Sequence, residues 1–426
     1  GSQLGVQPGA QSGISMPGKA RPAAPQTNTG WLEAWHDQSS RNWEVADTSD
    51  QAAGTGSGDW GKDGFQELDQ AAIFEEVSKA TMRVTDASRY PEQISTAFRI
   101  ATTGRPGPAY VDCAEDVLYT KVEESEAALA TRPESLSRSG ADPVSVKAAA
   151  DLLRSAKKPL IFAGGGAFFG KAWDELRELV ETANIPFYTS PISRGLIPDD
   201  HELSFLAARS TALREADVVL IVGTRLNWMM TFGGRIGPNA KLIQIDIEQS
   251  EIGHNRSVEV GLVGDCKVVL QQLLDSGIES EGADVRKEWT DYLDEANAVR
   301  VERAQANLNS DQVPIHPLRL CNEIDKFLDR DAIVTVDGNE ILHYGRQSIN
   351  TYYPGHRINS GPSGCMGVGL PYAIGAKVAK PDKQVLSLHG DGSLGMNMMD
   401  FDTAVRHDLP IVVVVSNNEG WAARVE

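Results

Sequence analysis

Residues 384–421 read QVLSLHGDGSLGMNMMDFDTAVRHDLPIVVVVSNNEGW and contain two apolar runs, each of which ends in a polar turn. The first run ends at GDGS (390–393) and the second at NNEG (417–420). The residues between them predict a helix, so the stretch predicts a strand–helix–strand unit of a parallel sheet. Ligand sites in open α/β sheets lie at the carboxyl ends of the strands. We therefore expect Asp391 and Asn418 to contribute to one binding site.

The two turns carry the groups that a magnesium–phosphate site requires. The carboxylate of Asp391, the amide oxygen of Asn418 and the carbonyl of Gly420 are hard oxygen ligands, and these suit Mg²⁺ that shares its shell with phosphates. The backbone amides of Gly392 and Ser393 open a helix and can donate to phosphate oxygens. Either turn alone is better explained as a simple tight turn. Together, on neighbouring strand ends, they favour the binding hypothesis.

The rest of the chain predicts an α/β protein with doubly wound parallel sheets. A length of 426 residues allows several domains. Helices alternating with apolar runs predict units at 58–130, 142–285 and 313–426, with a charged connector helix at 286–312. The apolar run at 411–415 predicts a buried parallel strand. Residues 1–57 lack periodicity and predict a disordered segment or one foreign to the fold, unless their tryptophans anchor on a neighbouring domain.

Charge and composition exclude several classes of protein. Forty Lys and Arg stand against 59 Asp and Glu, which gives a net charge of -19 and argues against nucleic acid or anionic membranes as partners. The four cysteines lie far apart and form no CxxC pair, so a zinc site or a disulfide framework is not expected. No run of about 18 apolar residues predicts a membrane span. These features favour the cytoplasm.

Residues 390–421 resemble the cofactor-binding segment of thiamine-diphosphate enzymes of the acetolactate synthase, oxalyl-CoA decarboxylase and 2-hydroxyacyl-CoA lyase group. Four other segments resemble the same group: GRPGPAYVDCAEDVL (104–118), GTRLNWMMTFGG (223–234), LIQIDIEQSEIGHNRSVEVGLVGD (242–265) and SGCMGVGLPYAIGAKVA (363–379). The resemblance implies pyrimidine-binding, central and diphosphate-binding domains, of which the first and last look incomplete. It also implies a homodimer or homotetramer.

The resemblance assigns residue roles and two cofactors, thiamine diphosphate and Mg²⁺. It places the metal on Asp391, Asn418 and Gly420. The cofactor's aminopyrimidine would meet the carbonyl of Gly364, and Met366 would hold the cofactor bent. Without its flanking glycines, Met366 would be interpreted as an ordinary core methionine. The resemblance also gives a second diphosphate turn, although a strand-end turn explains its three residues equally well: Asn339, Glu340 and Ile341. The activating glutamate of the group finds no match, because neither Glu33 nor Glu44 follows a suitable apolar strand.

The central unit raises a nucleotide question. GGGAFFG (164–170) follows a strand, but its last glycine lies one position too late for a dinucleotide-binding fingerprint. No acidic residue ends a second strand about 20 residues further along the chain, as an NAD site would require. Binding of NAD is therefore not expected. Asp246 could bind a ribose hydroxyl and Arg225 a phosphate. Alternatively, Asp246 belongs to a strand-end turn and Arg225 forms a surface ion pair. The resemblance implies FAD, ADP or no nucleotide in this domain.

The function implied by the resemblance is decarboxylation and carboligation of a 2-oxo acid, as in acetolactate synthase. One alternative is an acyl-CoA substrate, as in oxalyl-CoA decarboxylase or 2-hydroxyacyl-CoA lyase. A second alternative, favoured by the unmatched glutamate, is a non-catalytic fragment or pseudoenzyme. Of three histidines near the motifs, His343 is the candidate to face a reacting carbonyl, whereas His389 and His407 are expected to be structural.

Overall fold

The computed structural model describes residues 60–64, 67–127, 137–278 and 283–421. The predictions for residues 1–57, including the three tryptophans and the two unmatched glutamates, lie outside these residues. Within them the strands form parallel sheets of two, five and four strands. These sheets confirm the predicted α/β class with doubly wound parallel sheets. No helix in the described part is both long and apolar enough to cross a membrane.

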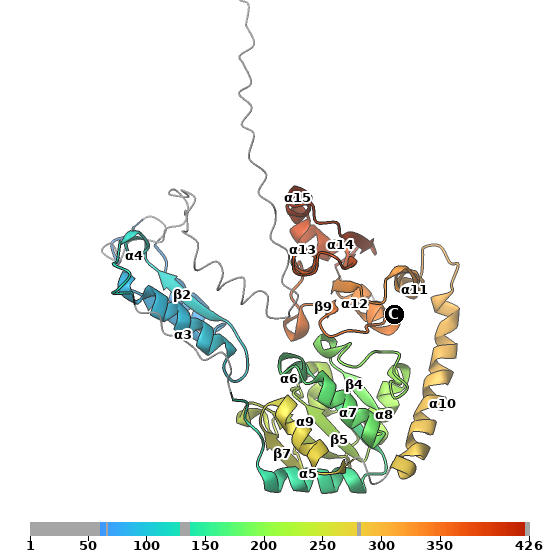
Figure 1. Ribbon diagram of the computed structural model, residues 1–426. Helices are drawn as coiled ribbons and strands as arrows, with labels where there is room; N and C mark the ends of the chain where they lie inside the picture. The colour runs from blue at the N-terminus through green and yellow to red at the C-terminus, as the bar shows by residue number, and fades with distance from the viewer. Residues whose placement is uncertain (1–59, 65–66, 128–136, 279–282, 422–426) are drawn as a thin grey trace, which may run out of the picture.

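The first unit is small and stands to one side of the others in Figure 1. Its elements are α2 (Gln70–Glu75), β1 (Ala80–Val84), α3 (Tyr90–Thr102), β2 (Ala109–Cys113) and α4 (Glu115–Tyr119). β1 pairs in parallel with β2. Pro91 lies in the first turn of α3, where a missing N–H costs no hydrogen bond. Val84, Ala114 and Val117 form its core.

The central unit is a five-stranded sheet with the strand order β4-β3-β5-β6-β7. Its strands are β3 (Pro159–Ala163), β4 (Phe187–Thr189), β5 (Val218–Val222), β6 (Lys241–Asp246) and β7 (Val260–Val263). Its helices are α5 (Pro143–Ser155), α6 (Gly165–Phe169), α7 (Trp173–Ala183), α8 (Arg209–Glu215) and α9 (Cys266–Asp275). β3 and β5 are buried at every position because helices cover both faces of the sheet. One apolar core includes α5, α7 and α9, and the other includes α8 and the start of α10 (Ala283–Leu308).

The glycine-rich turn after β3 serves backbone packing. The N–H of Gly166 donates to the carbonyl of Gly223 over 2.7 Å, and Gly223 has φ +58°. A Cβ on Gly223 would lie 2.6 Å from the Cα of Gly166, closer than any real contact. Two loops therefore cross here at a distance that only glycine permits. This packing explains the glycines at positions 164 and 166 without a nucleotide, whereas a Cβ on Gly165 would make only ordinary contacts.

Gly223→Ala is expected to lower the free energy of unfolding by about 3 kcal/mol, because it combines left-handed strain with overpacking. Gly253→Ala is the matched control, since Gly253 has φ +78° but a Cβ added there would meet nothing within 4 Å. That variant should lose only about 1 kcal/mol, from strain alone. Urea unfolding of both variants measures the difference. Equal losses would show that the loop crossing tolerates a methyl group.

The last unit is a four-stranded sheet with the order β11-β10-β8-β9. Its strands are β8 (Ile333–Asp337), β9 (Arg357–Ile358), β10 (Val385–Gly390) and β11 (Val412–Ser416). Its helices are α11 (Pro317–Phe327), α12 (Glu340–Ser348), α13 (Gly369–Ala379), α14 (Asp391–Asn397) and α15 (Phe401–Arg406). β9 and α12 were not predicted, and the helix expected after GDGS is split in two by a 3-10 turn at Met398–Asp400.

The prediction that residues 411–415 form a buried strand is wrong. The run does form the parallel strand β11, but Val412 and Val415 are each 39% exposed. Within the described residues β11 pairs only with β10, so it is an edge strand of this sheet. An apolar run fixes the tendency to form a strand, but the neighbouring elements decide whether that strand is covered.

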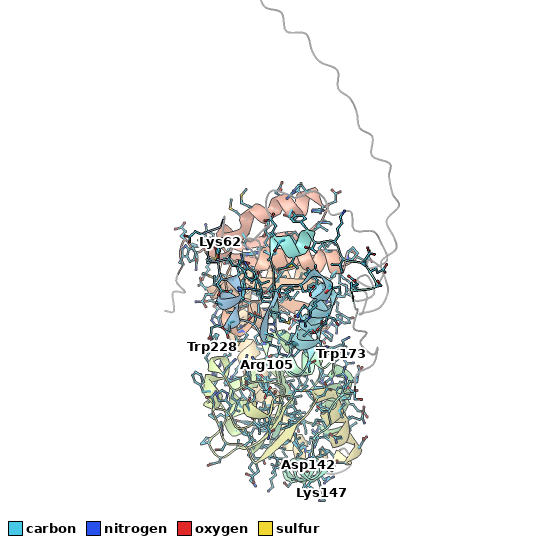
Figure 2. The ribbon with its side chains drawn as sticks, turned by 90° about the vertical axis from the view of Figure 1, so that its left-hand side faces the viewer. Lys62, Arg105, Asp142, Lys147, Trp173 and Trp228 are labelled. Atoms are coloured by element: carbon cyan, nitrogen blue, oxygen red, sulfur yellow. The ribbon has the colours of Figure 1, made fainter. Side chains whose placement is uncertain are left out.

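The units contact one another through residues far apart in sequence. Arg105 of the first unit forms an ion pair of 3.2 Å with Glu251 of the central unit. Trp228 of the central unit donates its indole N–H to the carbonyl of Pro362 over 3.0 Å. Figure 2 shows Arg105 and Trp228 at the level where the upper and lower parts of the molecule meet.

Candidate cofactor and metal site

Three strand ends of the last sheet converge on one small cavity. Gly390 lies opposite Ser416 in the β10–β11 register, and His389 lies opposite Asp337 in the β10–β8 register. The turns that follow these strands therefore meet at one edge of the sheet. They line a cavity of about 30 Å³ together with Met366: Gly338, Asn339, Glu340, Ile341, Gly390, Asp391, Gly392, Ser393, Ser416, Asn418, Gly420 and Trp421.

This cavity brings together most of the residues that the sequence singled out. The three metal-ligand candidates, the 339–341 turn, Gly392, Ser393 and Met366 all line it. Gly364 does not line it and instead ends the 3-10 turn Gly361–Ser363 with φ +65°. Met366 is 36% exposed, which differs from an ordinary core methionine. The segment of Gly364 and Met366 is tied to α14, because Asn397 Nδ2 donates to the carbonyl of Gly367 over 2.6 Å.

Hydrogen bonds orient the side chain of Asn418. Its Nδ2 donates to the carboxylate of Glu340, and its Oδ1 accepts from the N–H of Gly420 over 3.2 Å. The amide oxygen has a second lone pair that this arrangement leaves available. Glu419 adopts φ +59° between Asn418 and Gly420, which produces the tight turn. The turn thus places the amide oxygen of Asn418 and the backbone carbonyl of Gly420 at the same cavity as Asp391.

The donor set fits a hard cation bound through oxygen. No group of three or more His, Cys, Asp or Glu within the described ranges could hold a metal ion. A metal at this cavity would therefore rely on a mixed set of carboxylate, amide oxygen and carbonyl oxygen. Such a set suits Mg²⁺, which completes its octahedral shell with water and phosphate oxygens.

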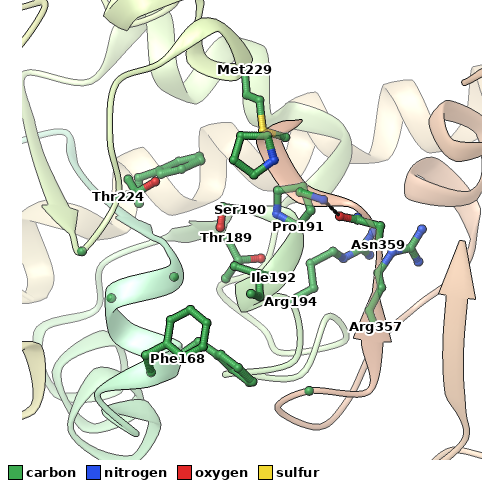
Figure 3. Close-up of a pocket in the computed structure, with 18 of the residues that line it drawn as sticks. Phe168, Thr189, Ser190, Pro191, Ile192, Arg194, Thr224, Met229, Arg357 and Asn359 are labelled. Atoms are coloured by element: carbon green, nitrogen blue, oxygen red, sulfur yellow. Dashed lines mark hydrogen bonds between the residues drawn. The ribbon is translucent and has the colours of Figure 1, made fainter. Parts of the chain in front are cut away.

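A second, much larger cleft of about 3110 Å³ lies between the units, and Figure 3 shows part of it. Arg225 and Asp246 both line this cleft, as do Gly165 and Gly166. Asp246 is 8% exposed, and burial raises the pKa of its carboxyl group. Its Oδ1 accepts from the N–H of Glu248 over 3.0 Å, as in a strand-end turn. Arg225 has no ion-pair partner among the residues that the structure describes.

The lining of the cleft is cationic, although the chain is acidic. Five of the described residues that line the cleft are acidic: Asp199, Asp246, Glu251, Asp265 and Asp325. Within the same described part of the chain, ten lining residues are arginines: Arg99, Arg105, Arg138, Arg194, Arg209, Arg225, Arg235, Arg300, Arg346 and Arg357. Three of these arginines form ion pairs with cleft acids, namely Arg105, Arg138 and Arg194. The cleft therefore offers an excess of positive charge to a ligand.

Several of these guanidinium groups are buried near one another. Burial, and then the charges of Arg235 and Arg346, lower the pKa of Arg209 to about 10. Burial, and then the charge of Arg194, lower the pKa of Arg357 to about 9. Nε of Arg209, Arg346 and Arg357 has no hydrogen-bond partner in the described part of the chain. Figure 3 shows Arg194 and Arg357 side by side at the edge of the cleft.

Comparison with known proteins decides the family. Residues 146–273 match the thiamine pyrophosphate enzyme central domain, and residues 342–424 match the C-terminal TPP binding domain of such enzymes. A 2-hydroxyacyl-CoA lyase of Arabidopsis thaliana is 34% identical over 427 residues, which cover 97% of this chain and 72% of that protein. The chain belongs to the thiamine pyrophosphate enzyme family.

Other members of the family are similar to a comparable degree. An acetolactate synthase large subunit of Mycobacterium tuberculosis is 35% identical over 366 residues, which cover 85% of this chain and 65% of that protein. An oxalyl-CoA decarboxylase of Escherichia coli is 34% identical over 362 residues, which cover 84% of this chain and 64% of that protein. The chain thus spans just under two thirds of the length of these two relatives. The resemblance that the motifs predicted is confirmed, and thiamine diphosphate is the cofactor that the C-terminal domain implies.

The histidines of this family member take different positions. His343 lines the large cleft but not the small cavity, and burial lowers its pKa. His389 is 1% exposed, and its Nε2 lies 2.7 Å from the hydroxyl of Ser387, as a structural residue would. His407 is exposed at the end of α15. The arginine-lined cleft was not predicted from the sequence, because its residues come from segments far apart and share no motif.

Proposed function

We propose that this chain binds thiamine diphosphate with Mg²⁺ and catalyses cleavage or formation of a carbon–carbon bond beside a carbonyl group. The observation that carries the proposal is the convergence of GDGS, NNEG and the 339–341 turn on one cavity of oxygen donors. Asp391, Asn418 and Gly420 would hold the metal. Gly392, Ser393 and the 339–341 turn would contact the diphosphate, and Gly364 and Met366 would contact the thiamine part.

The chain's own residues bind and orient the cofactor. When bound, thiamine diphosphate supplies a nucleophilic carbon and an electron sink for the breaking carbon–carbon bond. Glu340 holds the amide nitrogen of Asn418, so that the amide oxygen is the group left to face a cation. Asp391, Asn418 and Gly420 would hold a cation, whose positive charge would reduce the repulsion between the Glu340 carboxylate and a bound diphosphate.

The cationic cleft supports an acyl-CoA as the substrate class. A 2-oxo acid such as pyruvate carries one carboxylate, and one cation would balance it. An acyl-CoA thioester carries several phosphate charges on a long nucleotide tail, which suits a large cleft with unpaired arginines. We therefore place decarboxylation or cleavage of an acyl-CoA ahead of acetolactate synthesis from a 2-oxo acid. FAD or ADP bound beside Arg225 and Asp246 would be held by the same positive charges of the cleft. As the assembly, we propose a homodimer or homotetramer.

Binding and turnover test the two parts of the proposal separately. In titration calorimetry, thiamine diphosphate with Mg²⁺ should bind at one molecule per chain, and EDTA should abolish the heat. Oxalyl-CoA, 2-hydroxyacyl-CoA and pyruvate are then supplied in turn while carbon dioxide and aldehyde are measured. Turnover of a CoA thioester is the expected result, and turnover of pyruvate alone would overturn the substrate class.

Two other outcomes identify the alternatives. Cofactor binding without turnover of any of the three substrates would establish a non-catalytic role. An absorption band near the visible maximum of flavins in the purified protein would show that FAD occupies the cleft. A folded chain that gives no heat with thiamine diphosphate and Mg²⁺ would overturn the whole proposal.

A further inference from the structure

A chain of buried polar side chains lies directly beneath the small cavity. Thr335 and Asp337 are two residues apart on β8, so their side chains lie on the same face of the sheet. Ser387 and His389 hold the same relation on the neighbouring strand β10. All four are at most 3% exposed. None of them belongs to the proposed metal and diphosphate contacts.

These side chains hold the first residue of α13 from both sides. The N–H of Gly369 donates to Oδ2 of Asp337 over 2.8 Å, and the carbonyl of Gly369 accepts from Oγ1 of Thr335 over 2.9 Å. The packing around Gly369 is tight, because a Cβ on this residue would lie 2.7 Å from the Cβ of Asp337 and 2.6 Å from Cε1 of His389. The start of α13 therefore has one position relative to β8 and β10.

The same residues reach the GDGS turn. The hydroxyl of Ser393 donates to the backbone carbonyl of Asp337 and to that of Gly390, each over 3.1 Å. Asp337 thus connects the segment that carries Gly364 and Met366 with the turn that carries Asp391. A shift of Gly369 would move one part of the candidate site relative to the other.

The hydrogen bonds along this chain have a fixed direction. A carbonyl only accepts, so the single proton of Thr335 goes to Gly369. Ser387, whose Oγ lies 2.7 Å from Oγ1 of Thr335, must then donate to Thr335. Because the proton of Ser387 is used in this way, Nε2 of His389 must donate to Ser387. The arrangement requires His389 to carry its proton on Nε2.

We infer that Thr335 and Asp337 are positioning residues, which hold the Gly364–Met366 segment and the GDGS turn in register for the cofactor. The inference rests on the proposed binding of thiamine diphosphate. It predicts that the hydroxyl of Thr335 contributes to cofactor affinity although it lies beneath the cavity and does not line it. Loss of this hydroxyl leaves the carbonyl of Gly369 without one of its donors and frees the segment to shift.

Thr335→Val, which keeps the shape of the side chain, is expected to weaken binding of thiamine diphosphate with Mg²⁺ about tenfold. Thr335→Ser should restore the affinity. Thr290→Val is the matched control, because Thr290 is also buried and donates to a backbone carbonyl, that of Lys287, on the distant helix α10. Calorimetry measures the affinities, and thermal melting of the cofactor-free proteins measures stability. A role in stability alone would lower both melting temperatures and leave both affinities unchanged.

The direction of the hydrogen bonds from His389 through Ser387 to Thr335 can be measured without the cofactor. Long-range ¹H–¹⁵N spectra of the cofactor-free chain, compared with those of a His389→Gln variant, should show the Nε2-protonated tautomer for His389. The Nδ1-protonated tautomer would overturn the direction of donation from His389 to Thr335. A wild-type chain that does not bind thiamine diphosphate would overturn the proposed function and this role together. Normal affinity of Thr335→Val, or no rescue by Thr335→Ser, would overturn the positioning role alone.

Discussion

Asp391→Asn is expected to weaken binding of thiamine diphosphate with Mg²⁺ at least about 100-fold. Asp391 is the only carboxylate in the proposed metal set, since Asn418 offers an amide oxygen and Gly420 a carbonyl. Asparagine keeps the size of the side chain and one oxygen but removes the negative charge that attracts the cation. The loss should appear both in the affinity for the cofactor and in the concentration of Mg²⁺ needed to saturate it, measured by calorimetry.

The control for this prediction is Asp402→Asn, which makes the same change on the exposed face of α15, where Asp402 pairs with Arg406. That variant should bind the cofactor as the wild type does. The cofactor-free melting temperature of Asp391→Asn should be unchanged or higher, because Asp391 shares its small cavity with the carboxylate of Glu340. If Asp391→Asn bound the cofactor normally, the metal would have to lie elsewhere.

The sequence predicted that the GDGS and NNEG turns lie together because they are close to each other in sequence. GDGS and NNEG each directly follow a strand, and the two strands are joined by one short helical connection. Parallel pairing of consecutive strands then places both turns at the same edge. The 339–341 turn reaches the same cavity because β8 pairs with the other side of β10. Strand-end position therefore predicted that GDGS and NNEG meet, whereas the 339–341 turn and Met366 were assigned from the resemblance.

The sequence did not predict features that depend on surroundings. The apolar run at 411–415 predicted a strand correctly, but its exposure depends on which elements cover β11. The short strand β9 has only two residues, too few to show a period. The polar chain from Thr335 to His389 consists of single residues inside apolar runs, and only the pairing of β8 with β10 brings them together.

The arginines of the large cleft are the clearest such case. Arg194, Arg209 and Arg346 come from three segments of the chain, and none belongs to a recognisable motif. The acidic composition of the whole chain gave no indication of this cationic cleft. Net charge describes the surface as a whole, whereas a cleft can collect residues of the less abundant sign, here the positive one. Only the fold shows that ten arginines of the described residues line one cleft.

Arg346→Met is expected to weaken the binding of CoA and its thioesters about tenfold or more, because it removes a charge-assisted donor to phosphate. Burial, and then the charge of Arg194, lower the pKa of Arg346, and its Nε has no partner within the described residues. A cation in such surroundings costs free energy in the ligand-free protein. The variant should therefore melt at the same or a higher temperature than the wild type when no ligand is present.

The measurement is thermal melting with and without CoA. A ligand at 100 times its Kd stabilises a protein by about 2.7 kcal/mol, and a tenfold loss of affinity removes about half of that gain. Arg406→Met, on exposed α15, is the control and should respond to CoA as the wild type does. Binding of thiamine diphosphate should be unchanged in both variants, since Arg346 does not line the small cavity. A variant that is destabilised without ligand and stabilised normally by CoA would show that Arg346 supports the fold, and the acyl-CoA assignment would lose its main support.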